Sequence, residues 1–384
     1  MSWSLWAGAR ITLTPANRRY APLLMKIGVI GTGVIGLSSA VALRRHGNAD
    51  VTVYFRDDLA DTTSSRAGAV FTPFDAGEHA AWIGGSLRTF RDLARTQRKS
   101  GVRIGTAHEY LASNDPIPAW TSIVGGVRPF TRAWCSDAAP AHGFDIDVPM
   151  MDMRVYLAWL RAHALELGVR FVQRDVRSFA SVFQDGAEAI VNCAGLGARE
   201  LCDDPFVRPM RGQLLHVANT RGHTDAIATL EPNGGITYIY PFPDYIVLGG
   251  TYELDQARCE TDEASLSDIL ARCQRLMASH TGENADFLGA SVLRRVAGLR
   301  PARVVNGCHE HVRLEIEISS RGPIVHNYGH GRAGVTLSWG CADAVVALLD
   351  EATNAGIAAQ SARESEDGSP RRDLTPWPAP SVRG

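Results

Sequence analysis

Apolar residues recur along this chain with two different spacings, which separate expected strands from expected helices. Residues 26–31 form a short apolar run, which is typical of a buried strand. The apolar positions of residues 36–46 recur every three or four residues and predict a helix, and residues 50–55 again predict a strand. The fold is therefore expected to begin with a strand–helix–strand unit.

The rest of the chain mixes the same two patterns. Residues 213–253 alternate in the manner of antiparallel strands, with turn sequences at 232–235 and 243–244. Near the end, a strand, a glycine-rich turn and a helix follow one another. The further elements that the pattern predicts are helices over residues 155–167, 266–278 and about 335–349, and strands over residues 169–173, 189–192 and 324–328.

Composition and charge exclude several classes of protein. The chain has 384 residues, of which 45% are apolar, so it is long enough to bury a large core. A formal net charge of −2 gives no basic surface for nucleic acid or an anionic membrane, and no apolar run reaches the roughly 18 residues of a membrane span. The 7 cysteines include no Cys-x-x-Cys pair. We expect reduced thiols, no metal site and a cytoplasmic protein.

The two ends of the chain differ from its body. Residues 1–24 contain arginines and no acidic residue, but they lack the apolar centre of a signal peptide, and Met25 then opens the first strand. We interpret these residues as an N-terminal extension outside the core, with an organelle-targeting peptide as the alternative. Residues 353–384 are rich in proline, small and charged residues, which predicts a disordered tail.

A glycine-rich turn supplies the first candidate chemistry. Gly31, Gly33 and Gly36 are spaced as Gly-x-Gly-x-x-Gly, directly after the first strand and at the start of the helix. Such glycines allow a tight turn and a close approach of the backbone to a pyrophosphate at the helix N-terminus. Asp57 follows about 20 residues later, where an acid commonly binds ribose hydroxyls, and Arg56 could contact the adenosine or its phosphates. These residues alone leave NAD and FAD open.

Four further blocks resemble D-amino-acid oxidases. Residues 61–74 form a hydroxyl-rich stretch that leads to Ala-Gly and then Pro, residues 191–198 form a second glycine turn, and residues 209–213 read Pro-Met-Arg-Gly-Gln. Residues 326–342 (HNYGHGRAGVTLSWGCA) are similar to the signature of that family. The resemblance covers roughly residues 26–349, and the spacing between the blocks is kept.

This resemblance implies noncovalently bound FAD. A reduced flavin gathers negative charge at N1 and the C2 carbonyl, which a helix N-terminus after the last glycine turn would stabilise, with Thr336 as a hydrogen-bond donor. The residues predicted to bind the cofactor are Gly31, Gly33, Val34, Ile35, Gly36, Arg56, Asp57, Thr62, Thr63, Ser64, Gly68, Ala69, Thr72, Val176, Cys193, Ala194, Gly195, Arg300, Gly331, Arg332, Ala333, Gly334, Val335 and Thr336.

The resemblance also assigns the substrate site. Arg300, in a Gly-Leu-Arg-Pro segment, takes the role of the guanidinium that binds the substrate carboxylate, because a planar fork matches a planar anion. Tyr238 resembles the tyrosine whose hydroxyl supports that carboxylate, and Tyr252 resembles a second tyrosine of microbial members. Tyr238, Tyr252 and Arg300 are therefore the predicted catalytic residues, and together with Arg332 they form the predicted substrate site.

The implied reaction is the oxidative deamination of a D-amino acid to a 2-oxo acid, ammonia and hydrogen peroxide, with oxygen as the acceptor. The Cα hydrogen passes as hydride to flavin N5 without a dedicated base, so catalysis is mostly orientation and electrostatics. The implied partners are a small D-amino acid and oxygen, with neither nucleic acid nor a membrane. A homodimer is left open.

Two features depart from the family pattern or vary within it. Arg332 stands where the family has Gly, Ser or Ala. We favour an outward orientation, because a fixed cation beside the substrate amine would oppose the positive charge that develops there; an inward guanidinium would admit acidic substrates. Residues 229–237, the expected lid, are short as in microbial forms, and Glu231 is expected to point to solvent.

Other functions stay open beside this one. A D-aspartate oxidase and a glycine- or sarcosine-type amine oxidase are the nearest alternatives, and a flavin-binding protein without oxidase activity is a third. A nicotinamide dehydrogenase would leave residues 326–342 unexplained.

The expected fold class is α/β, with a Rossmann-like FAD-binding domain built from discontinuous segments and an antiparallel-sheet substrate domain. The predicted divisions are residues 1–24 for the N-terminal extension, residues 25–76, 150–212 and 296–352 for the FAD-binding domain, residues 77–149 and 213–295 for the substrate-binding domain, and residues 353–384 for the disordered tail.

Overall fold

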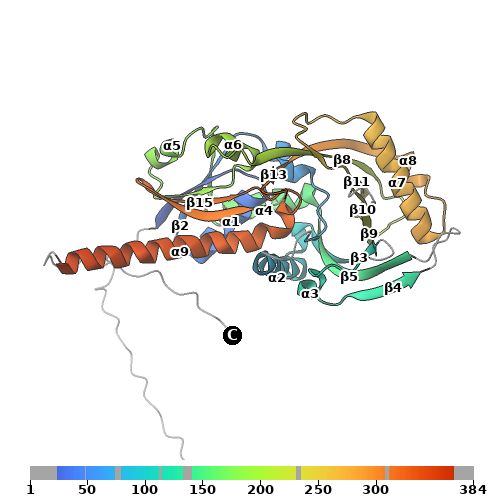
Figure 1. The fold of residues 1–384 in the computed structure, drawn as a ribbon, viewed down its shortest axis with the longest axis horizontal. Helices are drawn as coiled ribbons and strands as arrows, with labels where there is room; N and C mark the ends of the chain where they lie inside the picture. Colours follow the sequence, from blue (N-terminus) through green and yellow to red (C-terminus); the bar gives the residue numbers. More distant parts are fainter. Residues whose placement is uncertain are drawn as a thin grey trace, which may run out of the picture.

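A computed structural model describes residues 24–47, 49–73, 79–111, 115–132, 141–230, 235–307 and 311–366 of the chain. Within these residues the chain forms a six-stranded sheet and a nine-stranded sheet, which lie side by side in Figure 1. Helices pack against both sheets. The α/β class that the sequence predicts is confirmed.

The six-stranded sheet begins with the expected strand–helix–strand unit. β1 (Met25–Ile30) and β2 (Ala49–Phe55) pair in parallel, and α1 (Val34–His46) connects them. α1 ends at Gly47, whose φ of 105° lies in the left-handed region that glycine adopts without steric cost. The sheet order is β14-β15-β7-β1-β2-β6, and its remaining strands are β6 (Arg170–Gln173), β7 (Ala189–Asn192), β14 (Arg313–Ser319) and β15 (Gly322–Tyr328).

The helices beside this sheet pack closely on one another. α9 (Gly334–Glu366) lies against both α1 and α2 (Ala80–Thr96). A Cβ on Gly340 of α9 would come within 2.0 Å of the carbonyl oxygen of Trp82, so only glycine permits this contact between α9 and α2. The other helices of this part are α4 (Met153–Glu166), α5 (Phe179–Gln184) and α6 (Ala198–Leu201), and 3-10 helices span Leu59–Asp61, Thr63–Arg66, Arg98–Ser100 and Gly195–Gly197.

The nine-stranded sheet is antiparallel except where β3 and β9 pair in parallel. Its order is β12-β8-β11-β10-β9-β3-β5-β4, and β13 pairs with β8. The strands are β3 (Val102–Leu111), β4 (Arg128–Arg132), β5 (Ala141–Met151), β8 (Val207–Ala218), β9 (Ala226–Leu230), β10 (Ile236–Pro241), β11 (Tyr245–Gly249), β12 (Glu253–Leu254) and β13 (Val292–Arg303). The short helices α3 (Thr121–Val124) and α8 (Phe287–Ala290) complete this part.

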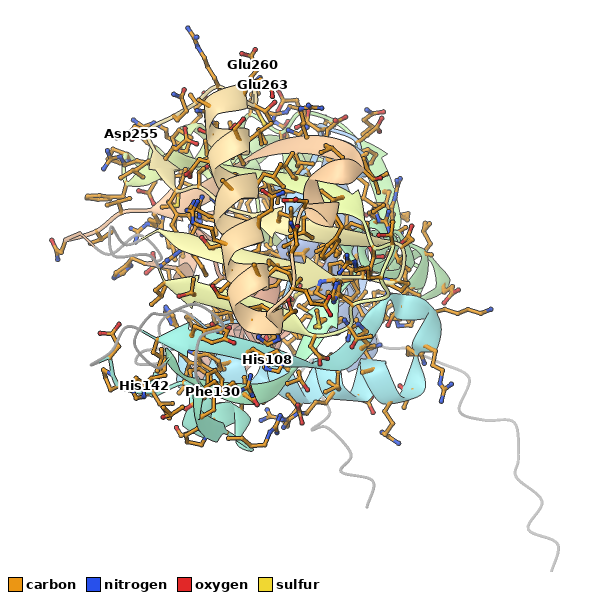
Figure 2. All side chains as sticks on the ribbon, turned by 90° about the vertical axis from the view of Figure 1, so that its right-hand side faces the viewer. His108, Phe130, His142, Asp255, Glu260 and Glu263 are labelled. Atoms are coloured by element: carbon orange, nitrogen blue, oxygen red, sulfur yellow. The ribbon has the colours of Figure 1, made fainter. Side chains whose placement is uncertain are left out.

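One face of the nine-stranded sheet is covered by α7 (Glu263–Thr281), which lies across the strands in Figure 2. Ile269 and Cys273 of α7 share a buried apolar cluster with Ile239 of β10. Successive side chains of a strand point to opposite faces, so Tyr238 and Tyr240 point away from α7. This second face, the inner face, forms a wall of the site described below.

The pair β8–β13 connects the two sheets. The two strands run antiparallel from Val207 opposite Arg303 to Val217 opposite Val292. At the far end of β13, Gly331 N–H donates a hydrogen bond to the carbonyl oxygen of Pro301 (3.0 Å). This contact brings β13 against the glycine turn that follows β15. The predicted domain boundaries at residues 212 and 296 fall inside this strand pair, and the division into domains stays a prediction.

The C-terminal helix corrects one expectation. The pattern places the end of this helix near residue 349 and a disordered tail from residue 353, whereas α9 continues to Glu366. The added turns contain five alanines, and Ala has the highest intrinsic helix propensity, which a search for apolar periodicity overlooks. Residues 1–23 and 367–384 lie outside the described residues.

Candidate active site

A cavity of about 480 Å³ lies between the two sheets. It is lined by residues at the carboxyl ends of β1, β2 and β7, where open parallel sheets bind ligands, and by inner-face residues of the nine-stranded sheet. Every residue predicted for the cofactor or substrate site lines this cavity except Gly36, Ala333 and Thr336. The chain therefore brings together segments that lie far apart in sequence, while the role of each residue stays a prediction.

The glycine turn after β1 is packed so tightly that side chains would not fit. A Cβ on Gly31 would come within 2.5 Å of the carbonyl oxygen of Cys193, and one on Gly36 within 2.0 Å of that of Gly31. Gly36 thus serves the close packing of α1 on the turn. Gly33 lines the cavity, and a Cβ there would lie 3.2 Å from the hydroxyl oxygen of Ser64. The N-terminus of α1 has no acidic residue in its first turn and suits an anionic pyrophosphate.

Arg56 and Asp57 line the cavity beyond the carboxyl end of β2, together with Val176. Nη2 of Arg56 lies 2.7 Å from Oδ2 of Asp57, and this hydrogen bond holds the pKa of Asp57 below its usual value. The carboxylate is therefore ionised at neutral pH and could accept hydrogen bonds from ribose hydroxyls. The same pairing orients the side chain of Arg56.

The hydroxyl-rich segment between Thr62 and Thr72 is held against the substrate-side strands. The Thr63 hydroxyl donates to the carbonyl oxygen of Leu299 (2.8 Å), one residue before Arg300. Ala69 has a φ of 39°, in the left-handed region that residues with a side chain rarely adopt. Strain of this kind gathers at functional sites, where the surrounding structure holds it in place.

Cys193, Ala194 and Gly195 continue from β7 into the cavity wall. Burial raises the pKa of the Cys193 thiol to about 12, so it is a neutral packing group and not a nucleophile. The φ of Gly195 is 58°, which favours glycine at this turn.

Two buried polar atoms beside the turn after β15 have no hydrogen-bond partner among the described residues. They are Nε2 of His330 and Oδ1 of Asn327, and both residues line the cavity. Burial lowers the pKa of His330 to about 3, so the imidazole is neutral at physiological pH. Buried polar groups without partners are costly, so these atoms fit a polar cofactor that fills the cavity. The Thr336 hydroxyl accepts a hydrogen bond from the backbone N–H of Thr72 (3.3 Å) and donates to the carbonyl oxygen of the same residue (3.5 Å).

Arg300 sits at the substrate side of the cavity. Its Nη1 donates to the carbonyl oxygen of Thr251 (3.0 Å), and its guanidinium carbon lies 5.0 Å from the centroid of the Tyr252 ring. Gly212 leaves the space for this position, because a Cβ there would come within 2.2 Å of Nη1 of Arg300. The carbonyl oxygen of Thr251 and the face of the Tyr252 ring therefore hold the guanidinium of Arg300, and the absence of a side chain at Gly212 leaves room for it.

Tyr238 is buried on the inner face of β10. Its ring lies against Gly249, where an added Cβ would come within 2.1 Å of Cζ of the ring. Burial raises the pKa of Tyr238 above its ordinary value, so the phenol stays protonated and can donate a hydrogen bond. A protonated donor at this place is what a substrate carboxylate requires.

The structure places the guanidinium of Arg332 beside Tyr252, and its orientation toward or away from the substrate stays a prediction. Its guanidinium carbon lies 5.0 Å from the centroid of the Tyr252 ring, and the residue lines the same cavity as Arg300. The attraction between a cation and an aromatic face, which the charge argument did not include, favours this position beside the ring. Glu231 lies outside the described residues.

Sequence reasoning missed several cavity residues, among them Tyr240, Asn327 and His330. Tyr240 stacks on Tyr238 with ring centroids 4.4 Å apart. The period of two along β10 puts both tyrosines on one face, so alternation could have identified Tyr240. Asn327 and His330 belong to the block 326–342, but nothing in its pattern distinguishes side chains that face the cavity from those that pack.

Comparison with known proteins identifies the family. Residues 26–348 match the DAO family, described as FAD dependent oxidoreductases. The chain belongs to this family. It is 40% identical over 331 residues to a D-amino-acid oxidase of Rubrobacter xylanophilus. That match covers 84% of this chain and 95% of the relative. It is 36% identical over 327 residues to a D-amino-acid oxidase of Streptomyces coelicolor, with 84% and 96% covered. Family membership confirms FAD over NAD.

Among solved structures, a glycine oxidase of Geobacillus kaustophilus has a similar fold. The TM-score is 0.68 at 17% sequence identity, and the match covers 85% of this chain and 95% of the other. At this identity the likeness concerns the fold alone.

Two properties of the described residues bear on partners. No helix among them is both long enough and apolar enough to cross a membrane. The same residues contain no group of three or more His, Cys, Asp or Glu side chains placed to hold a metal ion.

Proposed function

We propose that this protein catalyses the FAD-dependent oxidative deamination of D-amino acids to 2-oxo acids, ammonia and hydrogen peroxide. The observation that carries the proposal is one continuous cavity with a dinucleotide turn at Gly31–Gly36 and with Arg300, Tyr238 and Tyr252 in its wall. Membership of the FAD-dependent family and the two relatives named D-amino-acid oxidases support it.

FAD would be held by the N-terminus of α1, by Asp57, by the segment from Thr62 to Thr72 and by the turn after β15. Bound there, it supplies the acceptor for the hydride that leaves the substrate Cα. We further propose that it binds noncovalently. The division into an FAD-binding and a substrate-binding domain, a cytoplasmic location and a homodimer stay predictions.

The residues of the chain orient the substrate. Arg300 binds the substrate carboxylate through two N–H groups of its planar fork. The Tyr238 hydroxyl donates to the same carboxylate, and burial raises the pKa of this hydroxyl above its ordinary value, so it is protonated at neutral pH. The amine enters in its neutral form and needs no base. The barrier is thus lowered mainly by fixed geometry and fixed charge.

The test is anaerobic reduction of the FAD-loaded protein. Paired D- and L-enantiomers of alanine, methionine, aspartate and lysine are mixed with the holoprotein, and the loss of flavin absorbance is followed. We expect bleaching by D-enantiomers only, and hydrogen peroxide once oxygen is admitted. A flavin that no amino acid reduces would show a flavoprotein without oxidase activity, and reduction by glycine or sarcosine in preference would show the amine-oxidase alternative.

A further inference from the structure

A chain of hydrogen bonds continues from Arg300 away from the cavity. Nη1 of Arg300 donates to the carbonyl oxygen of Thr251 (3.0 Å). The hydroxyl of the same threonine donates to Oε1 of Glu253 (2.7 Å) and accepts from the backbone N–H of Gln213 in β8 (3.0 Å). Thr251 therefore links the guanidinium that lines the cavity to a carboxylate and to the neighbouring strand.

Glu253 lies at the centre of these contacts. It faces Arg211 across the pair β8–β12, and its Oε2 accepts from Nε of Arg211 (2.9 Å), while Nη2 of the same arginine completes the ion pair. Its Oε1 accepts from Nε2 of Gln213 (2.9 Å) as well as from Thr251. Desolvation opposes the charged form, but the hydrogen bonds that the carboxylate accepts outweigh it and hold the pKa of Glu253 below its usual value. The carboxylate is therefore ionised at neutral pH.

Gln213 extends the network to the start of α7. Its buried side chain donates through Nε2 to Oδ2 of Asp262 (2.8 Å), and its Oε1 accepts from the backbone N–H of Asp262 (2.8 Å). Asp262 in turn is the N-cap of α7 and accepts from the backbone N–H of Ser265 (2.8 Å). Figure 2 shows this end of the helix beside the labels of Glu260 and Glu263. The segment that leads from β11 to α7 is thus attached to β8 near both of its ends.

We propose that Glu253 is a positioning residue for the substrate carboxylate and acts through Thr251 on Arg300. The inference rests on the proposed function, in which Arg300 binds that carboxylate. A guanidinium that binds a carboxylate through two parallel N–H groups tolerates little rotation. The carbonyl oxygen of Thr251 holds one of its nitrogens, so the backbone at residue 251 sets the direction of the fork. A network in which every member is hydrogen-bonded is rigid, and it keeps this backbone in place.

The carboxylate of Glu253 is the group that this network requires. The groups directed at it are donors: the Thr251 hydroxyl, the Gln213 amide and the Arg211 guanidinium. An amide offers one acceptor oxygen in place of two, so the donors on one side would lose their acceptor, and the charge opposite Arg211 would be lost as well. Glu253→Gln therefore disturbs the network with almost no change of shape.

The experiment is a double-mutant cycle on the FAD-loaded protein. It measures kcat/KM for the D-amino acid that the unaltered protein oxidises fastest. Glu253→Gln should lower kcat/KM about 10-fold, chiefly through KM, which is the loss expected of one hydrogen bond to a charged group. In an Arg300→Ala background the same change should cost less than about 2-fold, because the guanidinium that it positions is gone. A residue that only stabilises the fold would cost the same in both backgrounds.

The matched control is Asp255→Asn. Asp255 also pairs with an arginine of β8, since its Oδ1 accepts from Nε of Arg208 (2.6 Å), but the two side chains are 54% and 34% exposed. Exposed pairs of this kind contribute little, and asparagine tolerates the φ of 63° at this position. This variant should keep kcat/KM within about 2-fold of the unaltered protein. FAD content and a thermal melt are recorded for every variant.

The outcomes separate the two proposals. If no D-amino acid reduces the flavin of the unaltered protein, the proposed function is wrong and the role of Glu253 falls with it. If a D-amino acid reduces the flavin but Glu253→Gln costs nothing, or costs equally with and without Arg300, the oxidase proposal stands and the positioning role is refuted. If Glu253→Gln does not retain FAD, Thr251→Val replaces it in the same cycle, because valine removes the hydroxyl that contacts Glu253 and leaves the ion pair with Arg211.

Discussion

At the scale of single residues, the function of Arg300 depends on the side chain that Gly212 lacks. A Cβ at residue 212 would come within 2.2 Å of Nη1 of Arg300, and the guanidinium is the flexible partner in that clash. We expect Gly212→Ala to displace the guanidinium and raise KM for D-amino acids at least about 10-fold, because a charge-assisted fork is lost. Steady-state kinetics and a thermal melt check this. A large loss of stability with unchanged KM would contradict it.

Removal of the Arg300 guanidinium should impair catalysis more than its displacement by Gly212→Ala. We expect Arg300→Ala to lower kcat/KM tens- to thousands-fold, which corresponds to about 2–5 kcal/mol for a lost charge-assisted pair. Tyr238→Phe should cost less, since it removes one hydrogen bond and leaves the ring in place. The bound flavin spectrum shows that each variant keeps its cofactor. Near-normal turnover of D-alanine or D-methionine by Arg300→Ala would exclude Arg300 from the site.

Glu109 predicts a pH dependence of stability. It lies opposite Ala228 of β9, which lies opposite Tyr238, so all three share the inner face of the sheet. Burial alone raises the pKa of Glu109 to about 7, above the value of about 4.3 for an unfolded chain. The folded state therefore binds this proton more tightly, and the contribution of Glu109 to stability is full below the unfolded pKa and lost as the pH rises to about 7.

The variant Glu109→Gln tests the predicted direction of this pH dependence of stability. Between about pH 4 and pH 8 its free energy of unfolding should rise relative to the unaltered protein, by on the order of 3 kcal/mol. Denaturant melts at the two pH values give this difference directly. Glu315→Gln, on the outer strand β14, is the control and should show no such rise. Equal pH dependence of the Glu109→Gln variant and the unaltered protein would show that the carboxyl is not buried in solution.

At the scale of elements, the turn between β1 and α1 determines whether FAD is retained. Gly33 lines the cavity at the N-terminus of α1, with Ser64 3.2 Å from an added Cβ. We expect Gly33→Leu to abolish FAD retention through gel filtration, because the side chain would occupy the place of the pyrophosphate. The control is Gly84→Leu in α2, where an added Cβ approaches only the end of Arg88, at 3.6 Å. That variant should stay yellow.

The sequence predicted the positions of helices and strands better than it predicted which strands pair with one another. The strand expected over residues 189–192 coincides with β7, and the opening strand–helix–strand unit agrees with β1, α1 and β2 within a few residues. Apolar runs and periodic patterns are local signals, so they survive without knowledge of the fold. The parallel pairing of β3 with β9 joins residues more than a hundred positions apart, and no local pattern encodes it.

The same distinction explains which site residues could be predicted. Residues in ordered motifs, such as Gly31, Thr63 and Gly331, were placed at the cavity from the sequence. The importance of Gly212 depends on register, because Arg300 must lie across β8 to clash with it. The position of Arg332 depends on an aromatic ring that comes 80 residues earlier in the chain. Contacts between segments that are distant in sequence determine the positions of such side chains, and local sequence propensity does not encode those contacts.

At the scale of the whole molecule, the cavity is walled by both sheets, so a bound cofactor should stabilise them together. A ligand that binds only the folded state adds RT ln(1 + [L]/Kd) to the free energy of unfolding, about 2.7 kcal/mol at a concentration of 100 Kd. We expect the melting temperature to rise by several degrees with FAD and to keep rising as FAD is increased. Melts followed by far-UV circular dichroism and by tryptophan fluorescence should shift equally.

The same experiment tests whether the cofactor is noncovalent. The thiols of Cys193 and Cys341 are buried and their pKa values are raised, which makes them poor nucleophiles toward a flavin. Heat or acid denaturation should therefore release all of the flavin into the supernatant, and added FAD should restore the spectrum and the raised melting temperature after refolding. Colour that stays with the precipitated protein would show a covalent bond. A melting temperature that does not respond to FAD would instead show that the cavity between the sheets is not where the cofactor binds.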